Sequence, residues 1–129
     1  MQYNKILRNY PMSKYREQAL FALGEYYFQL SGFEKSGEAF REFLDQYPDS
    51  EGKIHVLAYL LSIAREDHDV LLTEELEKQV VSLENVSLVF RDSKEFVYKS
   101  PLYKNHKAVV HIDKIEFYVE GEFFAKVSY

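Results

Sequence analysis

Two similar tetrapeptides, Tyr10-Pro11-Met12-Ser13 and Tyr47-Pro48-Asp49-Ser50, divide this chain of 129 residues. Their prolines are 37 residues apart (48 − 11), a spacing within the range of helical-hairpin repeats. Proline ends a preceding helix and is tolerated at the start of the next one, where a serine can cap the free amides. We therefore expect each tetrapeptide to mark a boundary between two helices.

Apolar residues at helical spacing predict four helices, over residues 13–30, 33–46, 50–66 and 73–84. The expected caps are Ser13, Ser50 and Thr73. The expected breaks are Ser31-Gly32 and the polar run around His68, which we interpret as a helix-end loop. Gly24 lies inside the first helix at a cost of about 1 kcal/mol relative to alanine. That cost is explained if the partner helix crosses closely at this position.

From Val86 onward the apolar period changes from 3.6 to 2, which predicts strands over residues 86–90 and 95–98 joined by a turn. The clearest hairpin turns on Glu120-Gly121-Glu122. Its expected pairs are Ile115–Val127, Phe117–Ala125 and Val119–Phe123 on one face, with Glu116–Lys126 and Tyr118–Phe124 on the other.

The sequence thus predicts an α+β fold, with helical repeats over residues 1–84 and a small antiparallel β-sheet over residues 85–129. A β segment of this size cannot form an independent core. We expect it to pack on the helices, on a copy of itself, or on sequence outside this chain. A homodimer through the β edge is therefore one of the open partner hypotheses.

Composition narrows the function classes. The chain has 11 Tyr and 10 Phe without Trp, so large rings must be buried or presented to a partner. A net charge of −5 disfavours nucleic acid as a partner. The lack of cysteine excludes disulfides, iron–sulfur clusters and thiolate zinc sites. No apolar run approaches the ~20 residues that span a bilayer, so we expect no membrane insertion.

The sequence contains no catalytic or metal-binding motif that we recognise. No Gly-rich phosphate loop, nucleophile elbow or H-E-x-x-H sequence occurs. His111 and Asp113, if on one strand, would project from one face with His106 nearby, but these three have no metal-ligand spacing signature. We therefore expect no catalytic residues, no metal and no cofactor, and predict that the chain is not an enzyme.

The segment from Ala19 to Pro48 resembles a tetratricopeptide repeat (TPR). The residues that carry the resemblance are Leu20, Leu23, Gly24, Tyr27, Phe33, Phe40 and Pro48. The likeness extends over residues 3–84, but Ser36 replaces the usual Ala, Phe43 is larger than usual, and Leu61 replaces the helix glycine of the second unit. The Tyr-Pro-x-Ser boundaries are similar to a branch common in bacterial envelope proteins, including Tol–Pal accessory and outer-membrane assembly proteins. The β segment resembles no family that we can name.

This resemblance implies antiparallel helical hairpins forming part of a right-handed α-solenoid, and a non-catalytic scaffold that binds a protein or peptide. It favours the periplasm or cell envelope, while the cytoplasm stays open. In the family, the first helix of each hairpin lines the binding groove. The positions that match are Gln18, Phe21, Glu25, Phe28, Gln29, His55, Ala58, Ser62, Arg65 and Glu66.

Several alternatives stay open from the sequence. Phe21 and Phe28 lie off the core face of their helix and could grip a peptide, or could pack on an upstream repeat or on the β segment. Arg65 could bind a carboxylate or pair with Glu66 or Asp69. Residues 1–9 match only the latter half of a second helix, so we expect the chain to be part of a longer protein. The alternative functions are a structural or oligomerisation segment with groove and sheet buried internally, and part of an enzyme whose active site lies elsewhere.

Overall fold

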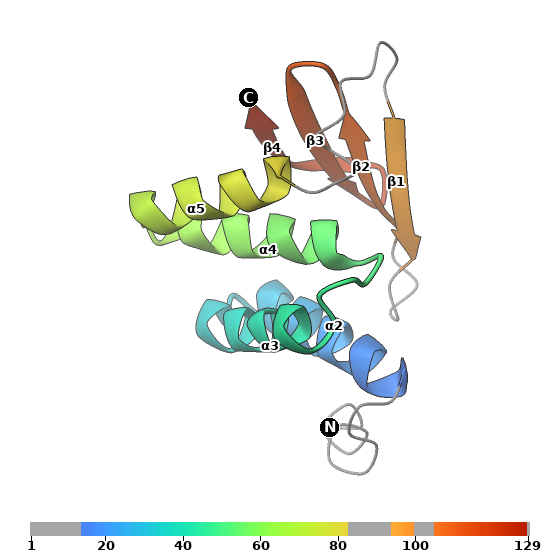
Figure 1. The fold of residues 1–129 in the computed structure, drawn as a ribbon. Coiled ribbons are helices and arrows are strands. Elements are labelled where there is room, and N and C mark those ends of the chain that lie inside the picture. The colour runs from blue at the N-terminus through green and yellow to red at the C-terminus, as the bar shows by residue number, and fades with distance from the viewer. Residues whose placement is uncertain (1–13, 83–93, 100–104, 129) are drawn as a thin grey trace.

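The computed structural model describes residues 14–82, 94–99 and 105–128. Within these ranges four helices come first: α2 (Lys14–Gln29), α3 (Phe33–Gln46), α4 (Lys53–Glu66) and α5 (Val70–Val81) (Figure 1). Four strands follow: β1 (Lys94–Lys99), β2 (Asn105–Val110), β3 (Lys114–Val119) and β4 (Glu122–Ser128). They form one antiparallel sheet in the order β1-β2-β3-β4. The predicted α+β class is confirmed, whereas the predicted cap Ser13 and the strand over 86–90 lie outside the described residues.

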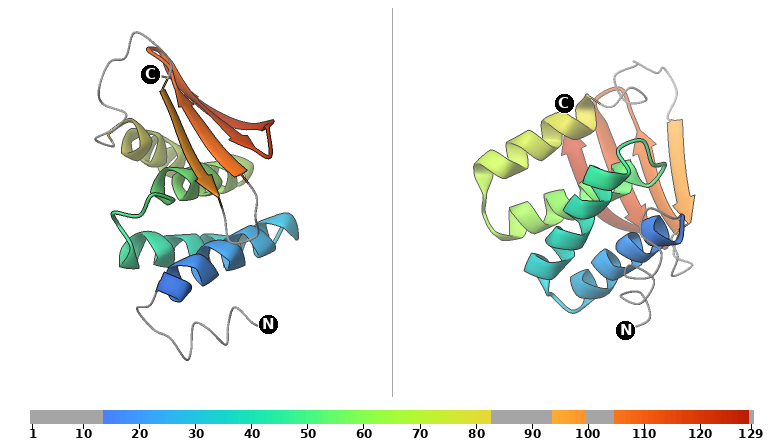
Figure 2. Two further views of the ribbon diagram at one scale, coloured as in Figure 1. Left: turned by 90° about the vertical axis from the view of Figure 1, so that its right-hand side faces the viewer. Right: turned by 60° about the horizontal axis from the view of Figure 1, so that its bottom comes forward.

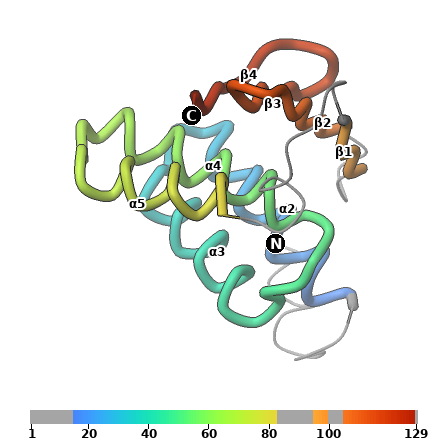
Figure 3. Tube along the Cα trace, turned by 45° about the horizontal axis from the view of Figure 1, so that its top comes forward, coloured from blue at the N-terminus to red at the C-terminus, as the bar shows by residue number. Residues whose placement is uncertain are grey.

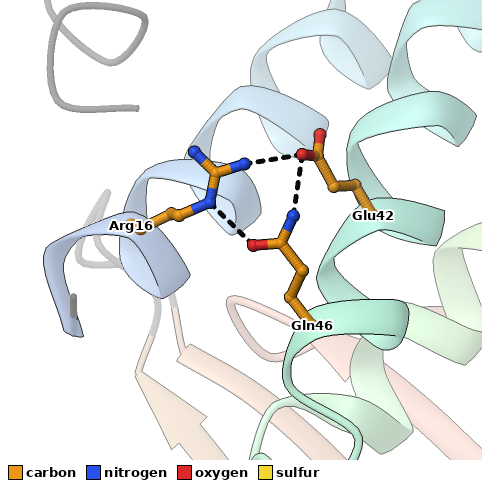
Figure 4. Close-up of polar contacts among 3 residues, drawn as sticks. All are labelled: Arg16, Glu42 and Gln46. Carbon is orange, nitrogen blue, oxygen red and sulfur yellow. Dashed lines mark hydrogen bonds and ion pairs between the residues drawn. The ribbon is translucent and has the colours of Figure 1, made fainter. Parts of the chain in front are cut away.

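Helices α2 and α3 form an antiparallel hairpin, as predicted. Arg16, near the start of α2, donates to two side chains near the end of α3: Nε to Gln46 Oε1 at 2.7 Å and Nη2 to Glu42 Oε1 at 2.6 Å (Figure 4). At the opposite end of the hairpin the ring centroids of Phe28 and Phe33 are 5.4 Å apart. The start of one helix therefore lies beside the end of the other.

Gly24 lies where α2 passes close to a side chain of α3. A Cβ added at Gly24 would lie 2.5 Å from Cζ of Phe40. That ring is fully buried and stacked on Tyr59, with centroids 4.8 Å apart, so it has no room to move aside. Ser36 lies one turn before Phe40 on α3, and its hydroxyl donates to the carbonyl oxygen of Gly24 at 2.8 Å. The predicted close crossing is confirmed, and Ser36 forms a hydrogen bond there that an alanine could not form.

We predict that Gly24→Ala lowers the free energy of unfolding by about 1–3 kcal/mol, because the overpacking cost exceeds the gain in helix propensity. The matched control is Gly37→Ala in α3. An added Cβ there meets only the flexible end of Arg41, at 3.1 Å from Nη1. Gly37→Ala should therefore leave stability unchanged or raise it by up to about 1 kcal/mol. Urea unfolding of the three proteins measures both effects, and equal losses in the two variants would contradict the close crossing.

Two predicted helix starts were wrong. Helix α4 begins at Lys53 and not at Ser50, whose hydroxyl oxygen accepts from the amide of Gly52 at 3.1 Å and so closes a turn before the helix. The Ser50 hydroxyl also donates to the carboxylate of Glu17. Helix α5 begins at Val70, three residues before Thr73, because the side chain of Asp69 accepts from the amide of Leu72 at 3.1 Å. Aspartate is one of the strongest N-cap residues, so the earlier cap prevails.

The hairpin of β3 and β4 has three of the five predicted residue pairs. Ile115 pairs with Val127, Glu116 with Lys126 and Phe117 with Ala125, as predicted. Beyond these pairs the register shifts, so that Tyr118 pairs with Phe123 and Val119 with Glu122. The predicted pairs Tyr118–Phe124 and Val119–Phe123 are therefore wrong.

A two-residue turn explains the shift. Glu120 and Gly121 both have left-handed backbones, with φ of 54° and 79°, as the tight turns that suit strand twist require. The shorter turn leaves Phe124 as an unpaired bulge residue. Its ring lies beside two helix residues, with centroids 5.1 Å from Tyr59 and 5.7 Å from Phe28.

Strand β2 was not predicted, because its first three residues, Asn105, His106 and Lys107, are polar. The placement of His111 and Asp113 on a strand was wrong. Both lie in the turn between β2 and β3, where Nε2 of His111 is 2.7 Å from Oε1 of Glu116. His68 has a φ of 56° between α4 and α5, which confirms the predicted helix-end loop.

The sheet packs on the helices, one of the three arrangements left open by the sequence. Figures 2 and 3 show it on one side of the helices, next to α4 and α2. Apolar side chains from the inner face of the sheet belong to the same core as Leu20, Leu57 and Leu61 of the helices. These sheet residues are Ala108, Val110, Ile115, Phe117, Ala125 and Val127. None of the helices in the described ranges has the length and apolar character needed to cross a membrane.

Candidate functional site

The face on which the resemblance places a binding groove lies against the sheet. Phe21 of α2 is fully buried, and its ring centroid lies 5.0 Å from that of Tyr98 on β1 and 5.4 Å from that of His106 on β2. Phe28, two turns later, lies beside Phe124 on β4. Both rings therefore pack against the β segment, which was one of the alternatives that the sequence left open.

The ten predicted groove residues separate into three groups by exposure. Phe21, Glu25, His55 and Ala58 are buried, Phe28 and Ser62 are half-buried, and Gln18, Gln29, Arg65 and Glu66 are exposed. The four buried residues contribute no surface to a partner while the sheet stays docked. Any partner of this face must instead use its exposed margin.

Beneath the sheet lies a cluster of four buried polar side chains, Glu25, His55, Tyr59 and His106, which we call the buried polar cluster. None is more than 5% exposed. Tyr59 Oη and His106 Nε2 are 2.7 Å apart, within hydrogen-bonding distance, and His106 Nε2 lies 4.0 Å from Oε2 of Glu25. The ring of His55 lies 5.6 Å from that of His106, and its Nε2 has no hydrogen-bond partner among the described residues.

Burial shifts the pKa values of His55, Tyr59 and Tyr98. Desolvation, together with the neighbouring His106, lowers the pKa of His55 from 6.5 to about 3. Desolvation, with a smaller effect of the Glu25 carboxylate, raises the pKa of Tyr59. Desolvation and then Glu17, Glu25 and Glu51 raise the pKa of Tyr98 to about 12. His55 and both tyrosines are therefore neutral at pH 7.

These residue types carry out acid–base chemistry in many enzymes, but their placement here does not suit it. A general acid or base must come within hydrogen-bonding reach of a substrate, and the sheet covers all four side chains. No group of three or more His, Cys, Asp or Glu residues in the described ranges could hold a metal ion. The cluster therefore fits a role in the core, where buried polar groups favour one packing arrangement over others.

We predict that His55 makes the fold sensitive to acid. Below pH 6.5 the unfolded chain takes up a proton that the folded chain excludes until about pH 3. The unfolded state then binds more protons, so stability is fully present above pH 6.5 and is lost as the pH falls. Urea unfolding of the wild type and of His55→Leu should show the difference.

Between pH 6 and pH 5 the free energy of unfolding of the wild type should fall more steeply than that of His55→Leu, by up to about 1.4 kcal/mol per pH unit. The matched control is His68→Asn, which removes an exposed histidine and retains a side chain that tolerates the left-handed backbone. Parallel pH profiles for the wild type and His55→Leu would contradict a neutral, buried His55.

At the exposed margin, Arg65 contacts the sheet. Its Nη2 donates to the carbonyl oxygen of Lys126 on β4 at 2.9 Å and lies 3.9 Å from Oε2 of Glu77. The predicted partners Glu66 and Asp69 are therefore replaced by β4 and α5. A shallow groove of about 530 Å³ opens here, lined by Ser62, Arg65, Glu66, Phe123, Phe124, Ala125 and Lys126.

A second hollow lies between α3 and α5, over α4, and we call it the outer cleft. Its volume is about 580 Å³. It is lined by Phe33, Glu34, Arg41, Leu44, Leu60, Ile63, Asp67, Leu72, Leu76 and Gln79. None of these was predicted as a binding residue. Apolar residues at helical spacing form the same sequence pattern whether they line a cleft or fill a core.

The sequence matches no protein-family model, and a search of curated proteins also gives no match. The TPR resemblance and the functions that it implies therefore stay predictions.

Proposed function

We propose that this chain is a non-catalytic protein-interaction module of TPR-like hairpins, and that it binds a partner in the outer cleft. The observation that carries the proposal is the contrast between the two sides of the helices. On one side, the sheet covers Phe21 and His55. On the other, the described residues leave an apolar cleft between α3 and α5.

The lining of the outer cleft suits an amphipathic helix. Its deepest apolar residues are Leu60, Ile63 and Leu76, which are 5%, 7% and 5% exposed. Leu72, at the side, is 40% exposed and available to a partner. The polar lining residues are Glu34, Arg41, Asp67 and Gln79. An amphipathic helix would place its apolar stripe against the leucines and its polar residues beside the mixed charges.

We predict that Leu72→Glu abolishes this binding, whereas Leu71→Glu does not. Leu71, the neighbouring residue, is 80% exposed and does not line the cleft. The two variants add the same charge one residue apart, so they separate a cleft effect from a change in net charge. Each should keep the fold, as checked by circular dichroism.

The probe is a displayed library of amphipathic helical peptides, selected on the wild-type chain. Selected peptides should bind Leu72→Glu at least about tenfold more weakly, a loss of about 1.4 kcal/mol, and bind Leu71→Glu as they bind the wild type. Failure to select any peptide, or peptides that bind all three proteins equally, would contradict binding in the outer cleft.

A second candidate function is a structural or oligomerisation segment. It is favoured by the shared core, in which Phe21 and His55 are buried by the chain's own sheet. In this case the sheet is a permanent part of the scaffold, and contact with other molecules occurs at its edges. The bacterial envelope location is a proposal that rests on the TPR resemblance alone.

A further inference from the structure

Three charged side chains line the outer cleft: Glu34 and Arg41 of α3, and Asp67 at the end of α4. All three are exposed, and none forms an ion pair or a side-chain hydrogen bond among the described residues. The arginines of α2 and α4 differ in this respect, because Arg16 and Arg65 each donate to an acceptor on another element. The charges of the outer cleft are therefore available to a partner.

The charges lie at two levels along the cleft. Helices α3 and α4 run in opposite directions (Figure 1), and the ring of Phe40 on α3 stacks on that of Tyr59 on α4. The start of α3, with Glu34, therefore lies beside the end of α4, with Asp67. Arg41 follows Glu34 by seven residues, which is about 10 Å along the helix axis. The lining is thus acidic at one end and basic two turns further along.

A partner that fills the cleft removes water from these charges. The floor is apolar, since Leu60 and Leu76 are each only 5% exposed. The guanidinium of Arg41 lies against its own helix, with Nη1 and Nη2 3.1 and 3.5 Å from the position that a Cβ on Gly37 would occupy. A helix on the apolar floor therefore lies beside this cation. A charge that loses water without gaining an opposite charge weakens binding.

We infer that the partner of the outer cleft is an amphipathic helix with one basic and one acidic residue about seven positions apart, beside its apolar stripe. The basic residue lies at Glu34 and Asp67, and the acidic residue accepts from Arg41. Residues seven apart share one face of a helix, so a single helix meets both ends of the cleft. This inference rests on the proposed function and adds the chemistry of the partner.

The charge pattern disfavours the simpler partners. A helix with only basic flanks places a cation at Arg41, and a helix with only acidic flanks places a carboxylate at Glu34 and Asp67. Either arrangement brings like charges together at an interface, which works against binding. A carboxylate at Arg41 can instead pair with two N–H groups of the guanidinium at once.

The probes are the peptides selected on the wild-type chain that lose binding to Leu72→Glu, and they should carry the inferred charge pair. Changing the acidic residue of such a peptide to lysine should weaken its binding to the wild type about tenfold, as measured by fluorescence anisotropy. Arg41→Glu should weaken binding of the original peptide to the same degree. Arg41→Glu should also bind the changed peptide as tightly as the wild type binds the original. That recovery shows at the same time that the variant folds.

Two neighbouring positions on α3 supply matched controls. Lys35→Glu makes the same charge change as Arg41→Glu, but Lys35 lies outside the cleft lining, with Nζ 5.4 Å from the ring centroid of Tyr27 on α2. At the acidic end, Glu34→Lys should weaken binding, whereas Glu38→Lys, an exposed change outside the lining, should not. Both controls should bind the original peptide as the wild type does.

The outcomes separate this inference from the proposed function. Peptides that lose binding to Leu72→Glu, but bind Arg41→Glu and Glu34→Lys as tightly as the wild type, would overturn the charge pattern and leave binding in the outer cleft in place. Selected peptides with only basic or only acidic flanks would also overturn the charge pattern alone. A library that gives no peptide sensitive to Leu72→Glu would overturn both.

Discussion

The burial of Phe21 is the interaction on which the rest of the structure depends. Its ring centroid lies within 6.2 Å of five other rings, those of Phe40, Phe43, Tyr59, Tyr98 and His106. These rings come from α3, α4, β1 and β2, so one side chain of α2 joins the helices to the sheet. A large aromatic residue buried at such a junction contributes several kcal/mol to stability. The sheet, too small to form its own core, is stabilised by this contact with the helices.

The helical half of the fold was predictable because its signals are local. The boundary at Pro48 and the break at Gly32 depend on near neighbours in the chain, and α3 begins and ends where predicted. The position of the sheet was not predictable. It depends on contacts such as Phe21 with His106, 85 residues apart (106 − 21), which leave no periodic signal. The bulge at Phe124 was not predicted for a related reason. The two-residue turn suits the twist of the strands, and the bulge that it creates places Phe124 against Phe28 and Tyr59, which are distant in the sequence.

For the same reason the structure places the candidate site on a different surface from the one that the sequence predicted. A repeat helix with Phe and Glu on its outer side has the same sequence whether that side meets a peptide or the chain's own strands. Four of the ten groove residues are buried, and the open apolar surface lies on the other side, between α3 and α5. The proposed function therefore uses the outer cleft, on the side of the helices that faces away from the sheet. The buried polar cluster lies between the helices and the sheet, and the contact of Tyr59 with His106 joins α4 to β2.

The sheet lies across α2 and α4 and fills the face that would otherwise form a groove. Proton–proton contacts measured by nuclear magnetic resonance in solution are the sharpest test of this packing. We expect cross-peaks between the ring of Phe124 and those of Phe28 and Tyr59, whose centroids are 5.7 and 5.1 Å away. We also expect cross-peaks between Phe21 and Tyr98. Internal cross-strand contacts in the sheet, without any of these contacts to the helices, would show that the sheet does not pack on this face.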